Sequence, residues 1–121
     1  MTSITISHLP IHYISGPMTG KPNFNYAYFD EIAANLRAQG FTILSPSELG
    51  DGSQHDPDAP QKPYGYWLRE AVKMLCRADR IIMIPGWTES KGARAEFAMA
   101  LDCGMEAYLY LPDDDDVRRV F

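Results

Sequence analysis

Few residues in this sequence are of the kinds that build disulfide frameworks or metal centres. Among its 121 residues are two cysteines, Cys76 and Cys103, and three histidines. Both cysteines fall within segments of helical pattern, so we expect buried free thiols in a reducing cytoplasm. Pro10 and a strand pattern argue against the helix that would bring His8 and His12 to one face. Neither a zinc site nor another cofactor is therefore expected.

Basic residues are too few and too scattered to form a track for nucleic-acid phosphates. The chain carries 11 lysines and arginines against 16 aspartates and glutamates, a net charge of -5 that is concentrated partly in Asp113–Asp116. Duplex nucleic acid is therefore excluded as a partner. No apolar run approaches the length of a membrane span, and the N-terminus lacks the basic start and apolar core of a signal peptide. We expect a cytoplasmic protein that does not act at a membrane.

What the sequence does contain is an alternation of short apolar runs with helical patterns. The runs lie at 11–15, 41–44, 81–84 and 106–111, and helical patterns begin near Phe24, Tyr64 and Ser90 between them. Such alternation predicts one α/β domain over residues 1–121, with a doubly wound, flavodoxin-like parallel sheet of four or five strands. Residues 1–9 would form an N-terminal arm or extend the first strand. Residues 112–121 would form a solvated acidic tail or a contact in a dimer.

Three loops leave the carboxyl ends of these strands, where ligands bind in doubly wound sheets. They are Gly16–Gly20, the stretch from Ser45 to Pro63, and Gly86–Ser90. The second loop holds too many prolines and glycines for regular structure, and long loops of this kind in compact domains are usually functional or disordered. We therefore expect a ligand pocket where the three loops meet.

A single acidic residue stands near the start of the third helical pattern. Ser90 is a good N-cap, and Glu96 would lean back over Gly92, where the missing side chain leaves space. The positive end of the helix dipole would favour the ionised form of Glu96 at neutral pH. An ionised carboxylate that faces a hole is suited to be a nucleophile, although a solvated surface glutamate would show the same local pattern.

Two aromatic residues have alternative interpretations. Tyr13, in the first strand, is either a core residue with its hydroxyl satisfied at the sheet edge or a part of the pocket. Trp87 either stacks on a base or covers the edge of the sheet. The sequence alone leaves both choices open.

Two separate motifs carry a family resemblance. The sequence YISGPMTG at Tyr13–Gly20 is followed much later by W-x-x-S-x-G-A-x-x-E at Trp87–Glu96. Together they resemble the nucleoside 2-deoxyribosyltransferase superfamily, and most closely its small, often phage-borne branch. The resemblance implies cleavage of the N-glycosidic bond of a nucleoside or nucleoside 5'-monophosphate, by hydrolysis or base transfer, through a glycosyl-enzyme. It also implies a homo-oligomer in which a neighbouring subunit completes the pocket.

The resemblance implies roles for individual residues as well. Glu96 matches the nucleophile, Tyr13 the tyrosine that orients it, and Ser90 the serine that binds a 5'-phosphate. Further contacts with the substrate are expected of Trp87, of the first loop and of the helix start, namely Ser15, Gly16, Pro17, Met18, Thr19, Gly20, Lys91 and Gly92.

The chain departs from the family pattern at two positions. Thr19 stands where the nucleotide-hydrolase branch has an arginine, so it brings no charge to a phosphate. Glu70 is the nearest match to the aspartate that helps to protonate the departing base, but it is one residue out of place, which is about 100° around a helix. These departures favour a rival interpretation, a nucleotide-binding or sensing module, such as a phage accessory protein, that lacks competent acid catalysis.

Overall fold

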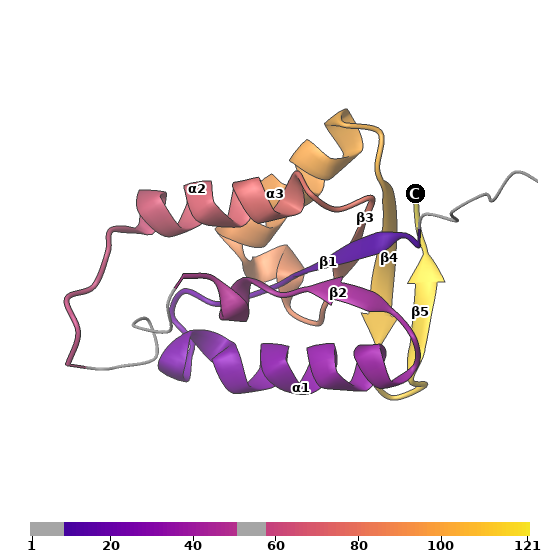
Figure 1. Cartoon of the computed structure of the whole chain (residues 1–121), viewed down its shortest axis with the longest axis horizontal. Coiled ribbons are helices and arrows are strands. Elements are labelled where there is room, and N and C mark those ends of the chain that lie inside the picture. The colour runs from indigo at the N-terminus through magenta and orange to yellow at the C-terminus, as the bar shows by residue number, and fades with distance from the viewer. Residues whose placement is uncertain (1–8, 51–57) are drawn as a thin grey trace, which may run out of the picture.

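The fold was analysed in a computed structural model that describes residues 9–50 and 58–121 (Figure 1). Most of the expected N-terminal arm, including His8, lies outside the described residues. The strands are β1 (Ile11–Ser15), β2 (Thr42–Leu44), β3 (Arg80–Met83), β4 (Glu106–Leu111) and β5 (Asp116–Arg119). The α-helices are α1 (Tyr26–Ala38), α2 (Tyr64–Leu75) and α3 (Lys91–Asp102), with short 3-10 turns η1 (Pro22–Asn25), η2 (Pro46–Glu48) and η4 (Trp87–Glu89).

The strands form one sheet in the order β2-β1-β3-β4-β5. β2, β1, β3 and β4 are parallel, and β5 runs antiparallel to β4. Tyr13 lies in the centre of the sheet, because it pairs with Leu44 on one side and with Ile81 on the other. The predicted α/β fold with four or five strands is confirmed.

The helices cover both faces of the sheet, with α1 on one side and α2 and α3 on the other (Figure 1). Since successive strand residues point to opposite faces, each strand serves both layers. The layer at α1 is packed from Ile14, Phe29, Ile32, Leu36, Ile43, Ile82 and Ile84. The layer at α2 and α3 is packed from Tyr13, Leu75, Ile81, Met83, Ala93, Ala100 and Ala107. Strand β3 is buried from both sides, as its apolar run predicts.

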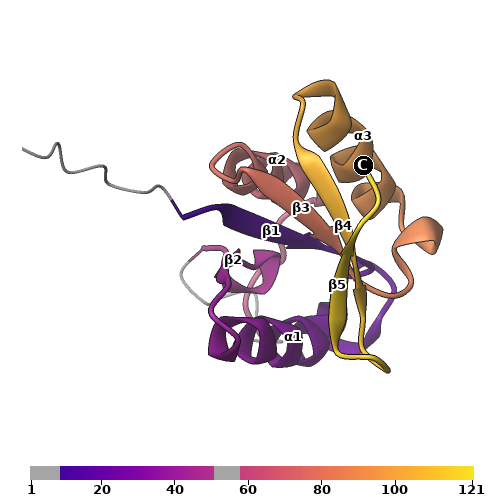
Figure 2. The ribbon, with the colours of Figure 1, turned by 90° about the vertical axis from the view of Figure 1, so that its right-hand side faces the viewer.

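The acidic C-terminal segment, for which the sequence predicts a solvated tail or a contact in a dimer, is mostly exposed but contains a short strand. Residues 112–115 make a turn, and β5 then pairs with β4 at the edge of the sheet (Figure 2). Asp115 adopts a positive φ of 46° and accepts hydrogen bonds from the Asn35 and Gln39 side-chain amides. Asp115 therefore ties the turn before β5 to α1.

Both cysteines are exposed, so the expectation of buried thiols is wrong. Cys76 and Cys103 stand at the positions where α2 and α3 end. Each cysteine comes directly after the last residue of its helix, so the apolar helical face that precedes it does not extend to the thiol. Among the described residues no helix has the length and apolar character of a membrane span.

Candidate active site

A cavity of about 550 Å³ opens at the carboxyl ends of β1 and β3. These neighbouring strands feed connections that run to opposite edges of the sheet, since β1 leads to β2 and β3 leads to β4. Such a switch point is where doubly wound sheets bind ligands. All three predicted loops reach the cavity, and α2 closes it from the far side. Its lining includes Gly16, Met18, Thr19, Phe24, Tyr26, Pro46, Leu49, Lys62, Tyr64, Trp67, Leu68, Glu89, Ser90, Lys91, Gly92 and Glu96.

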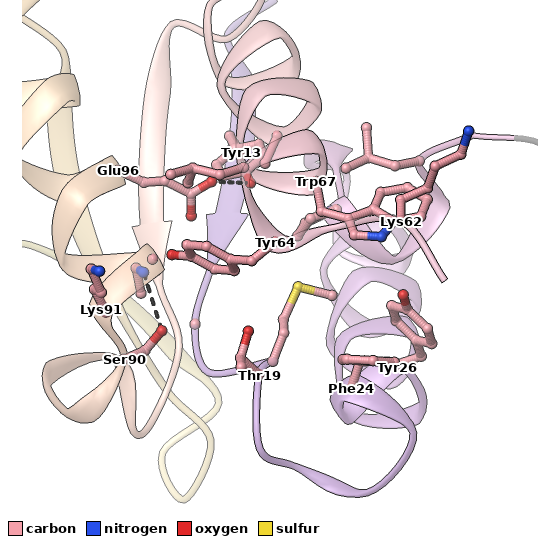
Figure 3. Close-up of a pocket in the computed structure, with 18 of the residues that line it drawn as sticks. Tyr13, Thr19, Phe24, Tyr26, Lys62, Tyr64, Trp67, Ser90, Lys91 and Glu96 are labelled. Atoms are coloured by element: carbon pink, nitrogen blue, oxygen red, sulfur yellow. Dashed lines mark hydrogen bonds between the residues drawn. The ribbon is translucent and has the colours of Figure 1, made fainter. Parts of the chain in front are cut away.

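The Glu96 carboxylate lies at the floor of this cavity and is only 6% exposed. The Tyr13 hydroxyl donates to Glu96 Oε2 at 2.6 Å, and the Ser15 hydroxyl donates to Oε1 at 2.6 Å. Tyr13 and Ser15 share one face of β1 because they are two residues apart. Each carboxylate oxygen thus has one donor from the same strand, which fixes its orientation toward the cavity (Figure 3).

The sequence motif anticipates the pairing of Glu96 with Tyr13, but it assigns Ser15 to the substrate. The structure shows Ser15 fully buried behind the carboxylate instead. The two-residue step from Tyr13 was the signal that could have revealed this, because it places both hydroxyls on one face of a strand.

Burial dominates the electrostatics of the Glu96 carboxyl. Desolvation raises its pKa above the ordinary value of 4.5, and the hydrogen bonds from Ser15 and Tyr13 offset only part of that effect. The helix dipole was expected to favour the ionised form of Glu96, but the net direction of its pKa is upward because burial has the larger effect. Burial also raises the pKa of Tyr13 well above 10.0, so that its hydroxyl remains a donor.

Ser90 caps α3 as predicted. Its hydroxyl oxygen accepts from the Ala93 backbone N–H at 3.1 Å. Lys91 and Gly92 follow in the first helical turn, and both line the cavity beside Glu96. The backbone N–H groups of the first turn point out of this end of α3, as helix geometry requires.

The space above Gly92 is taken by a residue that the sequence analysis did not single out. A Cβ at Gly92 would lie 3.2 Å from the hydroxyl oxygen of Tyr64, the first residue of α2. Tyr64, Trp67, Leu68 and Ala71 recur at helical spacing and all line the cavity. The helical pattern that begins near Tyr64 predicts this helix, but it does not show that one face of the helix borders the pocket.

The first loop is held tightly where it leaves β1. A Cβ at Gly16 would overlap Cγ1 of the Ile84 side chain, so a larger residue fits only if the Ile84 side chain or the backbone shifts. The Ile84 N–H also donates to the Ser15 carbonyl at 2.9 Å. The start of the loop is therefore fixed against the end of β3.

Farther along, the same loop enters three consecutive left-handed residues. The φ angles of Asn23, Phe24 and Asn25 are 48°, 53° and 63°, which non-glycine residues rarely adopt. The Asn25 side-chain amide donates to the Pro17 carbonyl at 2.9 Å, so it braces the loop and does not cap α1. The helix expected from Phe24 begins at Tyr26. Phe24 is thereby presented at the cavity.

Several predicted site residues lie outside the cavity lining. Trp87 packs on Phe97 with ring centroids 4.8 Å apart, the arrangement of a residue that covers the sheet. Pro17 is buried, and Gly20 is a turn residue with a φ of +85°. Glu70 accepts a hydrogen bond from Lys73 at 3.1 Å and does not line the cavity, so its position gives the expected acid role no support. Among the residues that the structure describes, the carboxylates lining the cavity are Glu89 and Glu96.

The chain was compared with protein families, with curated proteins and with solved structures. A family model described as "Domain of unknown function (DUF4406)" matches residues 10–109. The 2-deoxyribosyltransferase from the psychrotolerant bacterium Bacillus psychrosaccharolyticus has a similar structure, with a TM-score of 0.60 and 17% identity over 84% of this chain and 72% of that one. The 2-desoxiribosyltransferase from Leishmania mexicana has a TM-score of 0.59 and 19% identity over 84% of this chain and 63% of that one. No curated protein matches the sequence. The fold that the resemblance implies is thus confirmed.

Proposed function

The chain belongs to the DUF4406 family, and we propose that it cleaves the N-glycosidic bond of a nucleoside or nucleoside 5'-monophosphate through a glycosyl-enzyme on Glu96. The observation that carries this proposal is the buried Glu96 carboxylate, held by Tyr13 and Ser15 at 2.6 Å each on the floor of the cavity. A carboxylate fixed by two donors and shielded from water is pre-organised to attack an anomeric carbon.

The chemistry divides into two displacements. An oxygen of Glu96 bonds to the anomeric carbon while the carbon–nitrogen bond breaks, and the bonding electrons leave with the base. Water then attacks the same carbon and releases the sugar, or a second base takes it instead. The hydroxyls of Tyr13 and Ser15 keep the carboxylate aimed through both steps, and they stabilise it again as it departs.

The composition of the cavity wall supports a nucleoside as the substrate. Aromatic side chains from two directions line it, with Phe24 and Tyr26 at the first loop and Tyr64 and Trp67 on α2 (Figure 3). Such rings offer flat apolar surfaces on which any base can stack. The volume of about 550 Å³ falls within the roughly 300–1,000 Å³ typical of small-molecule sites.

Positive charge at the cavity supports a phosphate on the substrate. Lys62 and Lys91 both line it, and Lys91 stands at the start of α3, where backbone N–H groups favour anions. Thr19 contributes no charge, so in this proposal Lys91 replaces the arginine of the nucleotide-hydrolase pattern. Arg94 is not in the lining, and its Nε donates to the Ser90 carbonyl at 3.4 Å.

The position of Glu70 favours a second candidate, a nucleotide-binding module with weak or no catalysis. Protonation of the leaving base by a positioned acid is worth roughly 10²–10⁴-fold in rate. Glu70 is engaged with Lys73, and Glu89 is exposed at the cavity rim. A chain with this arrangement would hold a nucleotide without cleaving it quickly.

Incubation with a panel of nucleosides, deoxynucleosides and their 5'-monophosphates tests the proposal. We expect release of free base by chromatography, loss of that release in Glu96→Ala, and a Glu96-containing peptide heavier by one sugar residue after an acid quench. Glu31→Ala, at an exposed glutamate on α1, serves as the control and should retain activity. Tight nucleotide binding by the wild type with no base release would reject the enzyme and leave the binding module.

A further inference from the structure

Tyr64 places a hydroxyl group against the first turn of α3, the helix that carries Glu96, and both residues line the cavity. The hydroxyl oxygen of Tyr64 lies 3.2 Å from the point that a Gly92 Cβ would occupy. Gly92 and Glu96 are one helical turn apart, and the Glu96 side chain leans back toward that glycine. The absence of a side chain at position 92 is therefore what lets a hydroxyl from α2 come close to the floor of the cavity.

This hydroxyl differs from the others around the carboxylate in having no partner. The Tyr13 and Ser15 hydroxyls donate to Glu96, and the Ser90 hydroxyl oxygen accepts from Ala93. Within the described ranges, the Tyr64 hydroxyl forms no hydrogen bond with another residue. Tyr64 is 43% exposed, and in Figure 3 its ring crosses the cavity with the hydroxyl directed toward α3. It is thus a free donor and acceptor at the place where a substrate would lie.

The position of the Tyr64 hydroxyl indicates which part of a bound nucleoside it would contact. An anomeric carbon under attack must come within roughly 3–3.5 Å of a Glu96 oxygen, so the pentose covers the carboxylate. Phe24, Tyr26 and Trp67 lie on the other side of the Tyr64 ring from α3, where a base can stack (Figure 3). We infer that Tyr64 is a specificity-determining residue whose hydroxyl hydrogen-bonds a hydroxyl group of the pentose. The inference rests on the proposed function, because it assigns the same cavity a nucleoside.

The test combines removal of the Tyr64 hydroxyl with removal of each sugar hydroxyl in turn. Wild type, Tyr64→Phe and the control Tyr66→Phe are assayed for kcat/KM on one ribonucleoside and its 2'-, 3'- and 5'-deoxy forms. Tyr66 is a partly buried tyrosine two residues along α2 whose ring packs on Trp67 at 5.0 Å and which is not in the cavity lining. Binding of the same four compounds is measured in a Glu96→Gln background, so that the readout does not depend on turnover.

We expect Tyr64→Phe to lower kcat/KM and affinity for the parent nucleoside by about 3- to 30-fold, the range of one hydrogen bond. For one deoxy form the variant and the wild type should be equal, because the partner hydroxyl is already missing. Tyr66→Phe should behave as wild type on all four compounds. A Tyr64→Phe loss of equal size on every compound, or no loss on any, overturns the inference.

Failure of the proposed function has a different signature. A wild type that binds the nucleosides without releasing base rejects catalysis, yet the binding constants still decide the role of Tyr64 by the same pattern. A wild type that neither binds nor cleaves any of them overturns both. Since only one oxygen is removed from a residue that is 43% exposed, the variant should unfold at the wild-type temperature.

Discussion

Neighbouring residues of β1 serve the two faces of the sheet in different ways. Tyr13, Ile14 and Ser15 are all fully buried, but Ile14 points into the α1 layer and the other two point toward α3. The α1 layer is an apolar core in which every contact contributes to stability. The layer at α2 and α3 also contains the buried Glu96 carboxylate, whose hydrogen bonds come from the hydroxyls of Tyr13 and Ser15. Residues that are equally buried in β1 therefore have different effects: Ile14 packs in an apolar core, whereas Tyr13 and Ser15 hold an ionisable side chain in place.

The largest effect should follow from a cavity in the α1 layer. Leu36→Ala removes a side chain that is 0% exposed and should lower the free energy of unfolding by about 2–5 kcal/mol, with base release per folded molecule unchanged. Leu68 is half-buried in the cavity wall, so Leu68→Ala should lower stability less than Leu36→Ala does and should lower activity more. Urea unfolding measures the stability of each variant, and the base-release assay measures its activity. Equal stability losses would erase the distinction between the two faces.

A pair of tyrosines sharpens the comparison without creating a cavity. Tyr13→Phe removes the donor to Glu96 and should lower kcat/KM by about 10- to 100-fold, since hydrogen bonds to charged groups contribute about 1.5–3 kcal/mol. Tyr110→Phe removes a hydroxyl on the α1 face that accepts from Asn35 at 3.0 Å, and it should leave kcat/KM unchanged. If both variants lose activity alike, the hydroxyl at Tyr13 has no special role.

Substitutions at two glycines on the cavity side of the sheet should have smaller effects on stability and activity. Gly92→Ala should raise stability by up to about 1 kcal/mol through helix propensity, yet it should lower activity several-fold because the new Cβ presses on the Tyr64 hydroxyl at 3.2 Å. Gly65→Ala, where the nearest atom would be Arg69 Nη1 at an ordinary 3.5 Å, should share the gain without the loss. Thermal unfolding and kcat/KM distinguish the outcomes. A fully active Gly92→Ala would mean that the space above the helix is not used.

The smallest expected effect is a pH dependence of stability with opposite signs at two glutamates. Burial raises the Glu96 pKa, so its protonated form is favoured in the folded state, and stability falls as the pH rises through that pKa. Glu96→Gln should therefore be more stable than wild type near pH 7, and the difference should shrink toward pH 4. Base release by the wild type should fall as the pH is lowered through the Glu96 pKa, because the nucleophile must be ionised. Since that pKa is raised, the fall should begin at a higher pH than for an ordinary glutamate.

Glu48 provides the contrast. Its hydrogen bonds from Arg37 lower its pKa, so its contribution is present at neutral pH and is lost as the pH falls through that value. Since the pair is exposed, Glu48→Gln should cost only about 0.2–1 kcal/mol at pH 7. Chemical unfolding of both variants from pH 4 to 8 gives the two slopes. If the stability differences of the two variants from the wild type changed with pH in the same direction, the opposite pKa shifts assigned to Glu96 and Glu48 would be wrong.

Local patterns in the sequence were enough to predict the parallel strands and the cap at Ser90. Apolar runs specify strands buried on both faces, and a serine before a helical pattern specifies a helix start. The pairing of Tyr13 with Glu96 came from the family motif, because nothing local relates residues that lie 83 positions apart.

Other features depend on contacts that no local pattern encodes. β5 pairs with the edge of β4 although three of its four residues are charged, and only Val117 packs against the core. The left-handed turn at Asn23–Asn25 is held by the Asn25 bond to Pro17, which only the folded loop creates. The Tyr64 hydroxyl lies close to the first turn of α3 because Gly92, on another helix, leaves the space. The helical pattern of α2 identified its apolar face, but it did not reveal that part of this face borders an opening.

The close fit of Gly16 against Ile84 has a consequence for motion. The loop after β1 is anchored at its first residue by packing and by the bond from the Ile84 N–H to the Ser15 carbonyl, so it cannot swing from the strand as a whole. Any closure over a bound ligand must pivot later, in the exposed stretch that begins at Thr19. The carboxylate and its two hydroxyls therefore belong to this fixed frame, so an adjustment of the exposed stretch would leave the nucleophile in place.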